Sequence, residues 1–177
     1  QRRVCVSRPV KLIVDNYPEG QTEYFELPNN PGDPEAGTRK VPFSRELYIE
    51  EDDYSLNPPP KFFRLKPDGE VRLMGAYIVK FKNAVKDENG NVLELHCEAD
   101  LETKNGMPAD GRKIKGTIHW LSAKDALDTD IMLYNKLFTL ENVADIPEGK
   151  TYDDYINPDS VIKIEGAKIE ASLKDAK

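Results

Sequence analysis

The fold of this chain is organised around one stretch, Ala109-Asp-Gly-Arg-Lys-Ile-Lys-Gly-Thr-Ile-His-Trp-Leu-Ser122. The Asp110-Gly111 pair predicts a turn, since both residue types favour turn conformations. After this turn the side chains alternate with a period of two. One face carries Ile114, Gly116, Ile118 and Trp120, and the other carries Lys113, Lys115, Thr117 and His119. This pattern predicts a half-buried strand with an apolar face on a core and a basic face in solvent.

The basic face of this predicted strand has two interpretations, and both stay open at this point. Lysines on an exposed edge strand protect it against pairing with other chains. Cations in a row are also typical of surfaces that contact polyanions such as nucleic acids.

The composition is that of an acidic chain of ordinary size. Its 177 residues allow one large domain or two small ones, and the formal net charge is −7. An acidic balance argues against non-specific nucleic-acid binding, although local basic patches can exist on an acidic body. The sequence shows no apolar run long enough to span a bilayer and no signal-peptide pattern at its start. Cys5 and Cys97 are far apart in strand-like stretches, which favours free thiols in a reducing cytoplasm.

Short strands separated by turn residues are predicted throughout the chain. The strand patterns cover residues 10–14, 24–27, 45–50, 61–65, 70–82, 93–97, 130–138 and 161–165. Glu88-Asn-Gly-Asn91 predicts a hairpin turn, and prolines and glycines predict a long loop over residues 28–42. No helical period of useful length appears, so the predicted fold class is all-β, with barrels or a sandwich. The triproline Pro58-Pro-Pro60 marks the best internal boundary.

The sequence lacks the motifs that usually carry catalysis. It has no glycine-rich phosphate loop, no Gly-x-Ser-x-Gly elbow and no zinc-ligand spacing. His96 and Cys97 are adjacent in a predicted strand and therefore point to opposite faces, and the same holds for His119 and Trp120. We therefore predict a binding protein with no catalytic residue and no metal site.

Cations interleaved with aromatic rings indicate where single-stranded nucleic acid would bind. One group on the opening segment consists of Arg2, Arg3 and Arg8. A second group consists of Lys61-Phe-Phe-Arg64 with Arg72. Unstacked bases are held by stacking on aromatic rings and by arginine at base edges. Alternation along the predicted strand would send either Phe62 or Phe63 into the core.

Several segments, in this order along the chain, resemble one known family. They are Arg8-Pro-Val-Lys-Leu-Ile-Val-Asp-Asn-Tyr17, Leu27-Pro-Asn-Asn-Pro31, Gly37-Thr-Arg-Lys-Val-Pro-Phe-Ser44, Leu47-Tyr-Ile-Glu50, Glu70-Val-Arg-Leu73, the opening stretch up to Trp120, Leu133-Tyr-Asn-Lys-Leu-Phe138, Asn157-Pro-Asp-Ser160 and Ser172-Leu-Lys-Asp-Ala176. Together they resemble the C-terminal anticodon-binding region of bacterial-type glutaminyl-tRNA synthetase, over essentially the whole chain. The stretch from Asp110 to Trp120 is shared with eukaryotic and archaeal glutamyl-tRNA synthetases, whose anticodon-binding domain is the alternative.

The resemblance implies two β-barrels, one proximal and one distal to a catalytic core. The proximal barrel is discontinuous, with its first part expected in residues 1–58 and its return in residues 139–177. The distal barrel is expected in residues 59–138. Because the family continues past Ala176 into further proximal-barrel strands, we expect a fragment whose proximal barrel is incomplete. The two barrels would hold the splayed bases of an anticodon loop, each in its own pocket.

The resemblance also implies site residues. Arg2 matches a family arginine that contacts the middle anticodon base, Arg64 one that reads the third base, and Arg72 one that contacts the first base or its phosphate. A well-known family member has lysine where this chain has Phe63, so stacking is expected to replace a cationic contact there, with charge from Lys61. The expected nucleic-acid-binding residues are therefore Arg2, Lys61, Phe63, Arg64 and Arg72.

The partners implied by the resemblance are the anticodon loop of tRNA(Gln) and the catalytic domain of the same polypeptide. ATP and glutamine would bind that catalytic domain, so no cofactor is expected in this fragment, which would not aminoacylate tRNA by itself. We expect a cytoplasmic, monomeric protein without membrane contact.

Two other classes of function stay open. A barrel used only for protein interaction would present the acidic segments 50–53 and 141–154. A small-molecule enzyme would need a deep polar pocket that holds His96 or His119 beside a carboxylate.

Overall fold

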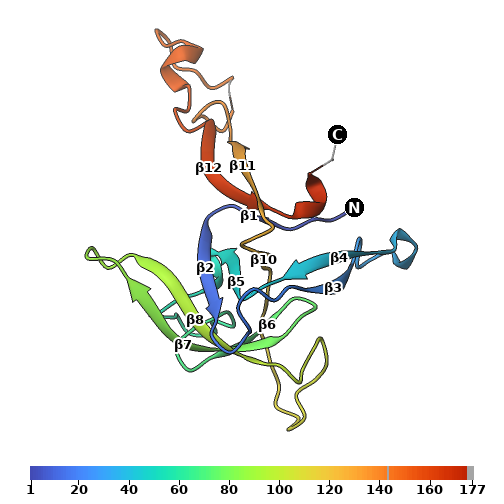
Figure 1. Cartoon of the computed structure of the whole chain (residues 1–177). Helices are drawn as coiled ribbons and strands as arrows, with labels where there is room; N and C mark the ends of the chain where they lie inside the picture. The colour runs from blue at the N-terminus through green and yellow to red at the C-terminus, as the bar shows by residue number, and fades with distance from the viewer. Residues whose placement is uncertain (143, 175–177) are drawn as a thin grey trace.

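The computed structural model describes residues 1–142 and 144–174, and strands dominate its regular structure (Figure 1). The strands are β1 Cys5–Val6, β2 Pro9–Val14, β3 Glu23–Pro28, β4 Thr38–Phe43, β5 Glu46–Glu50, β6 Glu70–Leu73, β7 Ile78–Lys86, β8 Val92–Asp100, β9 Thr117–Ile118, β10 Leu121–Ser122, β11 Leu127–Tyr134 and β12 Val161–Ile169. Short 3₁₀ turns form η1 Pro34–Ala36, η2 Glu51–Asp53, η3 Tyr152–Tyr155 and η4 Ala171–Leu173. The all-β prediction is confirmed. Within the described ranges no helix is long and apolar enough to cross a membrane.

Seven strands form one curled sheet in the order β10-β5-β2-β8-β7-β6-β9. Most neighbours are antiparallel, whereas β2 runs parallel to β8 and β6 runs parallel to β9. The edge strands β9 and β10 are separated in sequence by only His119 and Trp120. Three Cα–Cα steps span at most about 11 Å, so the sheet curls until its two edges approach each other. This closure gives the sheet the shape of a barrel.

The main hydrophobic core fills the inside of the curled sheet. Period-two alternation sends one face of each strand inward, and the fully buried aliphatic side chains include Leu12, Leu47, Val71, Leu95 and Ile118. The predicted hairpin at residues 88–91 is confirmed, since Asp87 bonds the N–H groups of Asn89 and Asn91 between β7 and β8.

A cluster of aromatic rings closes one part of this core. Phe25 and Phe43, on the β3–β4 hairpin, meet Tyr77 and Trp120 edge to face, with ring centroids 5.1–6.3 Å apart. The indole Nε1 of Trp120 donates a hydrogen bond of 2.9 Å to the carbonyl oxygen of Met74. Trp120 thereby fixes the short connection between β9 and β10 to the end of β6.

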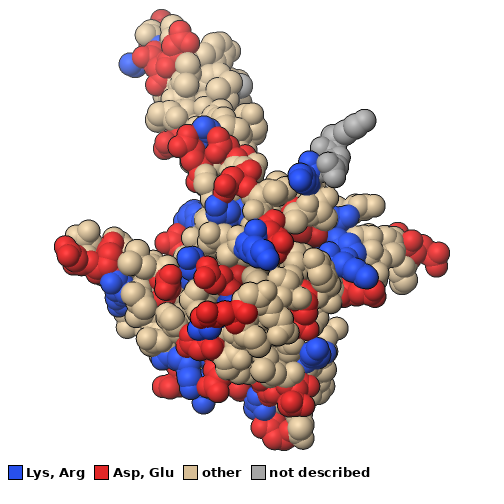
Figure 2. Space-filling model, in the orientation of Figure 1, with Lys and Arg blue, Asp and Glu red and all other residues tan. Residues whose placement is uncertain are grey.

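β3 and β4 pair as a separate two-stranded sheet, and β1, β12 and β11 form a three-stranded sheet in that order. The β11–β12 hairpin of this three-stranded sheet projects away from the barrel (Figure 1). A small cluster of Val4, Val6 and Leu121 packs where this sheet meets the barrel. Acidic side chains are prominent at the far end of the hairpin (Figure 2). Aliphatic side chains along the hairpin are open to solvent, with Leu133 and Ile162 both 44% exposed.

The predicted single strand over residues 70–82 is wrong. β6 and β7 are instead two antiparallel strands, and the Leu73 N–H donates to the Tyr77 carbonyl across the turn that joins them. Gly75 has a φ of +68° in this turn, which suits glycine. A Cβ at Gly75 would also overlap the side chain of Leu27.

The predicted strand over residues 61–65 is also wrong. The N–H of Phe62 closes a turn on the carbonyl of Pro59 at 3.2 Å, and Lys61 has a φ of +66°. Only Leu65 pairs, through an isolated bridge with Tyr54. The turn places the Phe63 and Arg64 side chains irregularly rather than on alternating faces.

The sheets do not follow the domain boundaries expected at residues 58 and 138. β2 and β5 precede residue 58 but share the barrel with β6–β10, because β2 pairs with β8 from Lys11↔Glu94 to Val14↔Cys97. β11, expected in the distal barrel, pairs with β12 in the projecting sheet. The assignment of residues 1–58 and 139–177 to a proximal barrel and of 59–138 to a distal barrel stays a prediction.

Candidate nucleic-acid interface

A row of polar side chains on the outside of the barrel connects the expected binding residues. The exposed members of this row are Lys113, Lys115, Thr117 and His119, whereas Gly116, Ile118 and Trp120 are buried. The predicted alternation of exposure is therefore confirmed, whereas the predicted strand is wrong over residues 113–116, because β9 covers only Thr117–Ile118.

A concavity of about 280 Å³, which we call the Phe63 pocket, opens at one end of the row. It is lined by Phe62, Phe63, Arg64, Lys66, Gly69, Glu70 and residues 113–116. The Phe63 residue is 51% exposed, and the Lys115 Nζ lies 5.3 Å from the centroid of its ring. Phe62 is half-buried outside the main core, so the prediction that one of these rings enters the core is wrong.

A second concavity of about 210 Å³, which we call the Arg2 pocket, lies at the other end of the row. It is lined by Arg2, Arg3, Val4, Leu27, Pro28, Pro31, Arg39, Met74, His119 and Trp120. Apolar side chains thus meet three guanidinium groups in one hollow. Arg2 is exposed, and its backbone N–H is fixed by a 2.7 Å hydrogen bond to the carbonyl of Asn29.

A buried carboxylate holds two of these three arginines. Glu170 is 1% exposed and accepts hydrogen bonds from the Arg39 Nε and Nη2 at 2.5 and 2.7 Å. The Arg3 Nε lies 3.9 Å from the same carboxylate. Burial raises the pKa of Glu170, but the bonds from Arg39 and Ser172 outweigh that effect and leave the pKa below its ordinary value. Arg2 has no carboxylate within ion-pair distance among the described residues, so its charge faces outward.

Arg64 is oriented by the acidic turn η2 and remains half open to solvent. Its Nη1 donates to the carbonyl of Asp52 at 2.8 Å, and its Nε lies 3.4 Å from the Asp53 carboxylate. Burial raises the pKa of Asp53, whereas the positive charge of Arg64 opposes that rise. The row connects the two pockets, since its residues 113–116 line the Phe63 pocket and its His119 lines the Arg2 pocket. The acidic segment 50–53 orients a cation here rather than standing free as a docking surface.

Arg72 points outward from β6, but its guanidinium group forms hydrogen bonds with a neighbouring loop. Its backbone pairs beside Thr117 of β9, which places it on the same face as the polar row. Its Nη2 donates to the carbonyl of Gly106 at 2.5 Å, and its Nη1 lies 3.4 Å from the carbonyl of Ala76. The guanidinium group is half-buried and holds the loop between β8 and β9.

Several lysines around the Phe63 pocket have no carboxylate within 4.0 Å in the part of the chain that the structure describes. They are Lys61, Lys66, Lys113 and Lys115. Lys61 is exposed and precedes the pocket in sequence without lining it. Arg8 differs from these lysines, because it pairs with Glu51 at 3.6 Å.

The structure thus brings Arg2, Phe63 and Arg64 to one connected surface. Arg72 lies on the same face with its guanidinium group engaged, and Lys61 is exposed but lines neither pocket. Sequence reasoning missed Lys66 and His119 as parts of this surface. The period-two pattern marked His119 as outward-facing, but no local signal marks Lys66, whose position follows from the turn that its carbonyl closes with Gly69.

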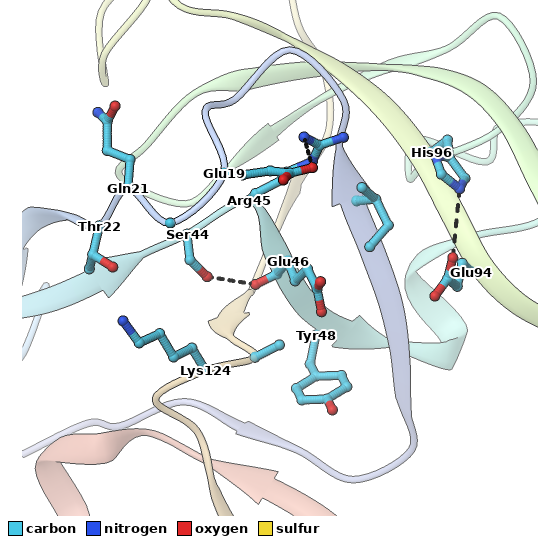
Figure 3. A pocket seen from close by; sticks show the side chains of 13 residues that line it. Glu19, Gln21, Thr22, Ser44, Arg45, Glu46, Tyr48, Glu94, His96 and Lys124 are labelled. Atoms are coloured by element: carbon cyan, nitrogen blue, oxygen red, sulfur yellow. Dashed lines mark hydrogen bonds and ion pairs between the residues drawn. The ribbon is translucent and has the colours of Figure 1, made fainter.

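A larger concavity, about 610 Å³, lies elsewhere, against β2, β5 and β8 (Figure 3). Its polar groups are largely partnered: Arg45 pairs with Glu19 at 2.9 Å, and the Nδ1 of His96 forms a hydrogen bond of 2.8 Å with Asp15. A histidine beside carboxylates is what a small-molecule enzyme would require. However, the Ser44 hydroxyl in this pocket bonds the carbonyl of Glu46 and the Ser122 hydroxyl, and not the imidazole. Among the described residues, this pocket therefore offers His96 no activated nucleophile.

Comparison with known proteins identifies the family. A family model described as "tRNA synthetases class I (E and Q), anti-codon binding domain" matches residues 1–100. A second model with the same description matches residues 117–177. The chain belongs to this family of anticodon-binding domains.

Individual relatives narrow the comparison to one kind of ligase. The chain is 48% identical to "Glutamine--tRNA ligase" of Bradyrhizobium diazoefficiens and 50% identical to that of Clostridium perfringens, in each case over 99% of this chain. It is 44% identical to the protein of the same name from Pseudomonas syringae pv. tomato. The resemblance drawn from the sequence is confirmed. The chain spans about a third of the length of these relatives, 31%, 31% and 30% respectively.

Proposed function

We propose that this chain reads the anticodon of tRNA(Gln) for a glutaminyl-tRNA synthetase whose catalytic domain belongs to the same polypeptide. The observation that carries the proposal is the connected surface from the Phe63 pocket to the Arg2 pocket. This surface combines exposed cations with a half-exposed aromatic ring on a chain whose net charge is −7. Single-stranded RNA is recognised by that combination of stacking, base-edge contacts and phosphate contacts.

The three arginines differ in what they offer to RNA. Arg2 and Arg64 keep outward-facing donors, which suits bidentate contacts to base edges. We assign the middle base to Arg2 and the third base to Arg64. Arg72, whose guanidinium group already donates to Gly106, suits a contact at the first base or its phosphate. Lys61 and Phe63 contribute charge and stacking next to Arg64.

In this proposal the residues of this chain take no part in the aminoacylation reaction itself. ATP and glutamine would bind the catalytic domain, and the anticodon-binding chain would contribute selection of the tRNA. We also propose that the complete protein is cytoplasmic and monomeric.

Substitution of Arg64 tests the proposal. The change Arg64→Ala should weaken binding of the chain to the tRNA(Gln) anticodon stem-loop by about 1–3 kcal/mol and relax discrimination at one base. Arg45→Ala is the matched control, because Arg45 pairs with Glu19 in the concavity against β2, β5 and β8, away from the proposed surface. Equal loss of affinity in the two variants, or no loss in either, would contradict the assignment.

A further inference from the structure

The Phe63 ring is held at the surface by its backbone on both sides. A Cβ at Gly116 would overlap the carbonyl oxygen of Phe63, so the two backbone segments are in direct contact. Two residues later, Leu65 is completely buried, and its N–H donates to the carbonyl of Asp53 at 3.0 Å. The ring therefore cannot sink into the core without breaking these contacts, and it stays exposed in a fixed place.

The pocket around the ring carries uncompensated positive charge. Its lining includes Lys66, Lys113 and Lys115, and Glu70 is the carboxylate among the residues that line it. Glu70 pairs with Arg112, whose Nε lies 3.0 Å from the carboxylate and which also pairs with Asp100 and Asp110. The lysines that line the pocket have no carboxylate within 4.0 Å among the described residues, so their ammonium groups are available.

Lys115 contacts the Phe63 ring directly. Its ammonium group stands over the face of Phe63, 5.3 Å from the ring centroid. An exposed cation–π contact of this kind is weaker than the stacking of a base on an aromatic ring. A base that stacks on Phe63 would displace the ammonium group, which would then lie beside the base and its phosphate.

The size of the pocket limits what it can hold. At about 280 Å³ it is smaller than the pockets that enclose drug-sized ligands. It suits one planar base with its phosphate outside, among the lysines. Arg64 lines the same pocket, so its guanidinium group can reach the edge of a base stacked on Phe63.

We propose that the Phe63 pocket is a nucleotide subsite in which Phe63 stacks on one unstacked base while Lys115 leaves the ring and binds the phosphate of that nucleotide. This inference rests on the proposed function, which places the third anticodon base next to Arg64. Stacking by Phe63 already belongs to the proposed function. The inference adds that Lys115 changes its contact from the ring to the phosphate when the base stacks.

Binding of the chain to two RNA stem-loops tests the stacking platform. One is the intact tRNA(Gln) anticodon stem-loop, and the other lacks the base at the third anticodon position. Phe63→Ala should lower affinity for the intact loop about 5- to 150-fold and leave affinity for the abasic loop unchanged. Phe63→Tyr, which keeps the ring, should bind both loops as the unsubstituted chain does. Tyr24→Ala, on an exposed ring outside the pocket, should change neither affinity.

The salt dependence of binding tests the phosphate contact. Lys115→Ala should weaken binding and reduce the slope of log affinity against log salt by about 0.7, the value for one single-strand phosphate. Lys124 is an exposed lysine of the concavity against β2, β5 and β8, and Lys124→Ala should leave the slope of log affinity against log salt unchanged. An increase in affinity in Lys115→Ala would show that the lysine only competes with the base, and would overturn the exchange.

Other outcomes separate this subsite from the proposed function. If Arg64→Ala weakens binding while Phe63→Ala binds both loops as the unsubstituted chain does, the anticodon function stands and the subsite is wrong. If the unsubstituted chain binds the intact loop no better than a loop with all three anticodon bases replaced, the function itself is wrong. The thermal unfolding midpoint of Phe63→Ala should equal that of the unsubstituted chain. This result would show that a change in binding is not due to misfolding.

Discussion

Gly116 lies directly against the carbonyl oxygen of Phe63, so closely that any Cβ at position 116 would overlap that oxygen. This contact joins the turn after the triproline to the chain entering β9. It explains why the outward row at residues 113–119 and the Phe63 ring form one surface, although 50 residues separate them in sequence.

Substitution of Gly116 should therefore disturb the interface. Gly116→Ala should destabilise the chain by about 1–3 kcal/mol, the usual cost of overpacking a well-packed contact. It should also weaken RNA binding, since the displaced segment carries Phe63 and Arg64. Urea unfolding and stem-loop titration measure the two effects. Gly111→Ala is the control for volume alone, because a Cβ there meets no neighbour, although its φ of +71° carries its own strain. Unchanged RNA binding in a folded Gly116→Ala chain would contradict the account.

Arg112 should support RNA binding without touching RNA. It pairs with Glu70 at the edge of the Phe63 pocket, and with Asp100 and Asp110, and so offsets part of the negative charge there. Arg112→Gln should free the Glu70 charge and lower RNA affinity, and a second change, Glu70→Gln, should restore much of that loss. If the double variant binds as weakly as Arg112→Gln, charge at Glu70 is not the cause. Both measurements belong at low salt, where electrostatic effects are largest.

The buried Glu170 carboxylate should make stability depend on pH. Its folded-state pKa lies below the ordinary value, so it stabilises the folded state above the unfolded-chain pKa of about 4.3. This contribution should disappear as pH falls through the folded-state value. Glu170→Ala should cost about 3–5 kcal/mol at pH 7, because Arg39 would keep a buried charge without its partner.

Urea unfolding at several pH values checks this prediction. The gap in unfolding free energy between the unsubstituted chain and Glu170→Gln should be largest near pH 7 and narrow toward pH 3. A gap that stays constant with pH would show that the carboxylate charge is not what matters at this position.

The two cysteines should react differently with thiol reagents. Cys97 is completely buried in β8, and burial, with a smaller effect of Asp15, raises its pKa to about 12. Cys5 is exposed, although burial of its thiol and the charge of Glu50 also raise its pKa. Thiol labelling of the native chain at pH 8 should therefore modify Cys5 first, and denaturant should release Cys97. Equal labelling rates in the native state would show that β8 opens readily.

Local patterns predicted some elements well because their cause is local. The alternation at residues 113–119 and the turn at residues 88–91 depend on neighbouring side chains, and both are confirmed. The pattern over residues 70–82 was misleading because the period of two runs without interruption through Gly75, although the backbone turns there. Only the positive φ and the nearby Leu27 side chain reveal the hairpin.

The sheet arrangement and the shape of the site depend on contacts between residues far apart in the sequence, which local patterns do not predict. β2 pairs with β8 across about 80 residues, which places residues 9–14 in the barrel despite the triproline boundary. The site shows the same limit. Arg64 and Phe63 were predicted from residue type, whereas the pocket that joins them to Lys66 and Lys113 arises from packing of the turn on Gly116.

Discrimination between anticodons tests the central claim most directly. The chain would be titrated with the tRNA(Gln) anticodon stem-loop and with a stem-loop of equal length in which all three anticodon bases are replaced, over a series of salt concentrations. We expect both affinities to fall with salt and the cognate loop to bind at least tenfold more tightly at each concentration. Equal affinity for the two loops across the series would contradict anticodon reading by this surface.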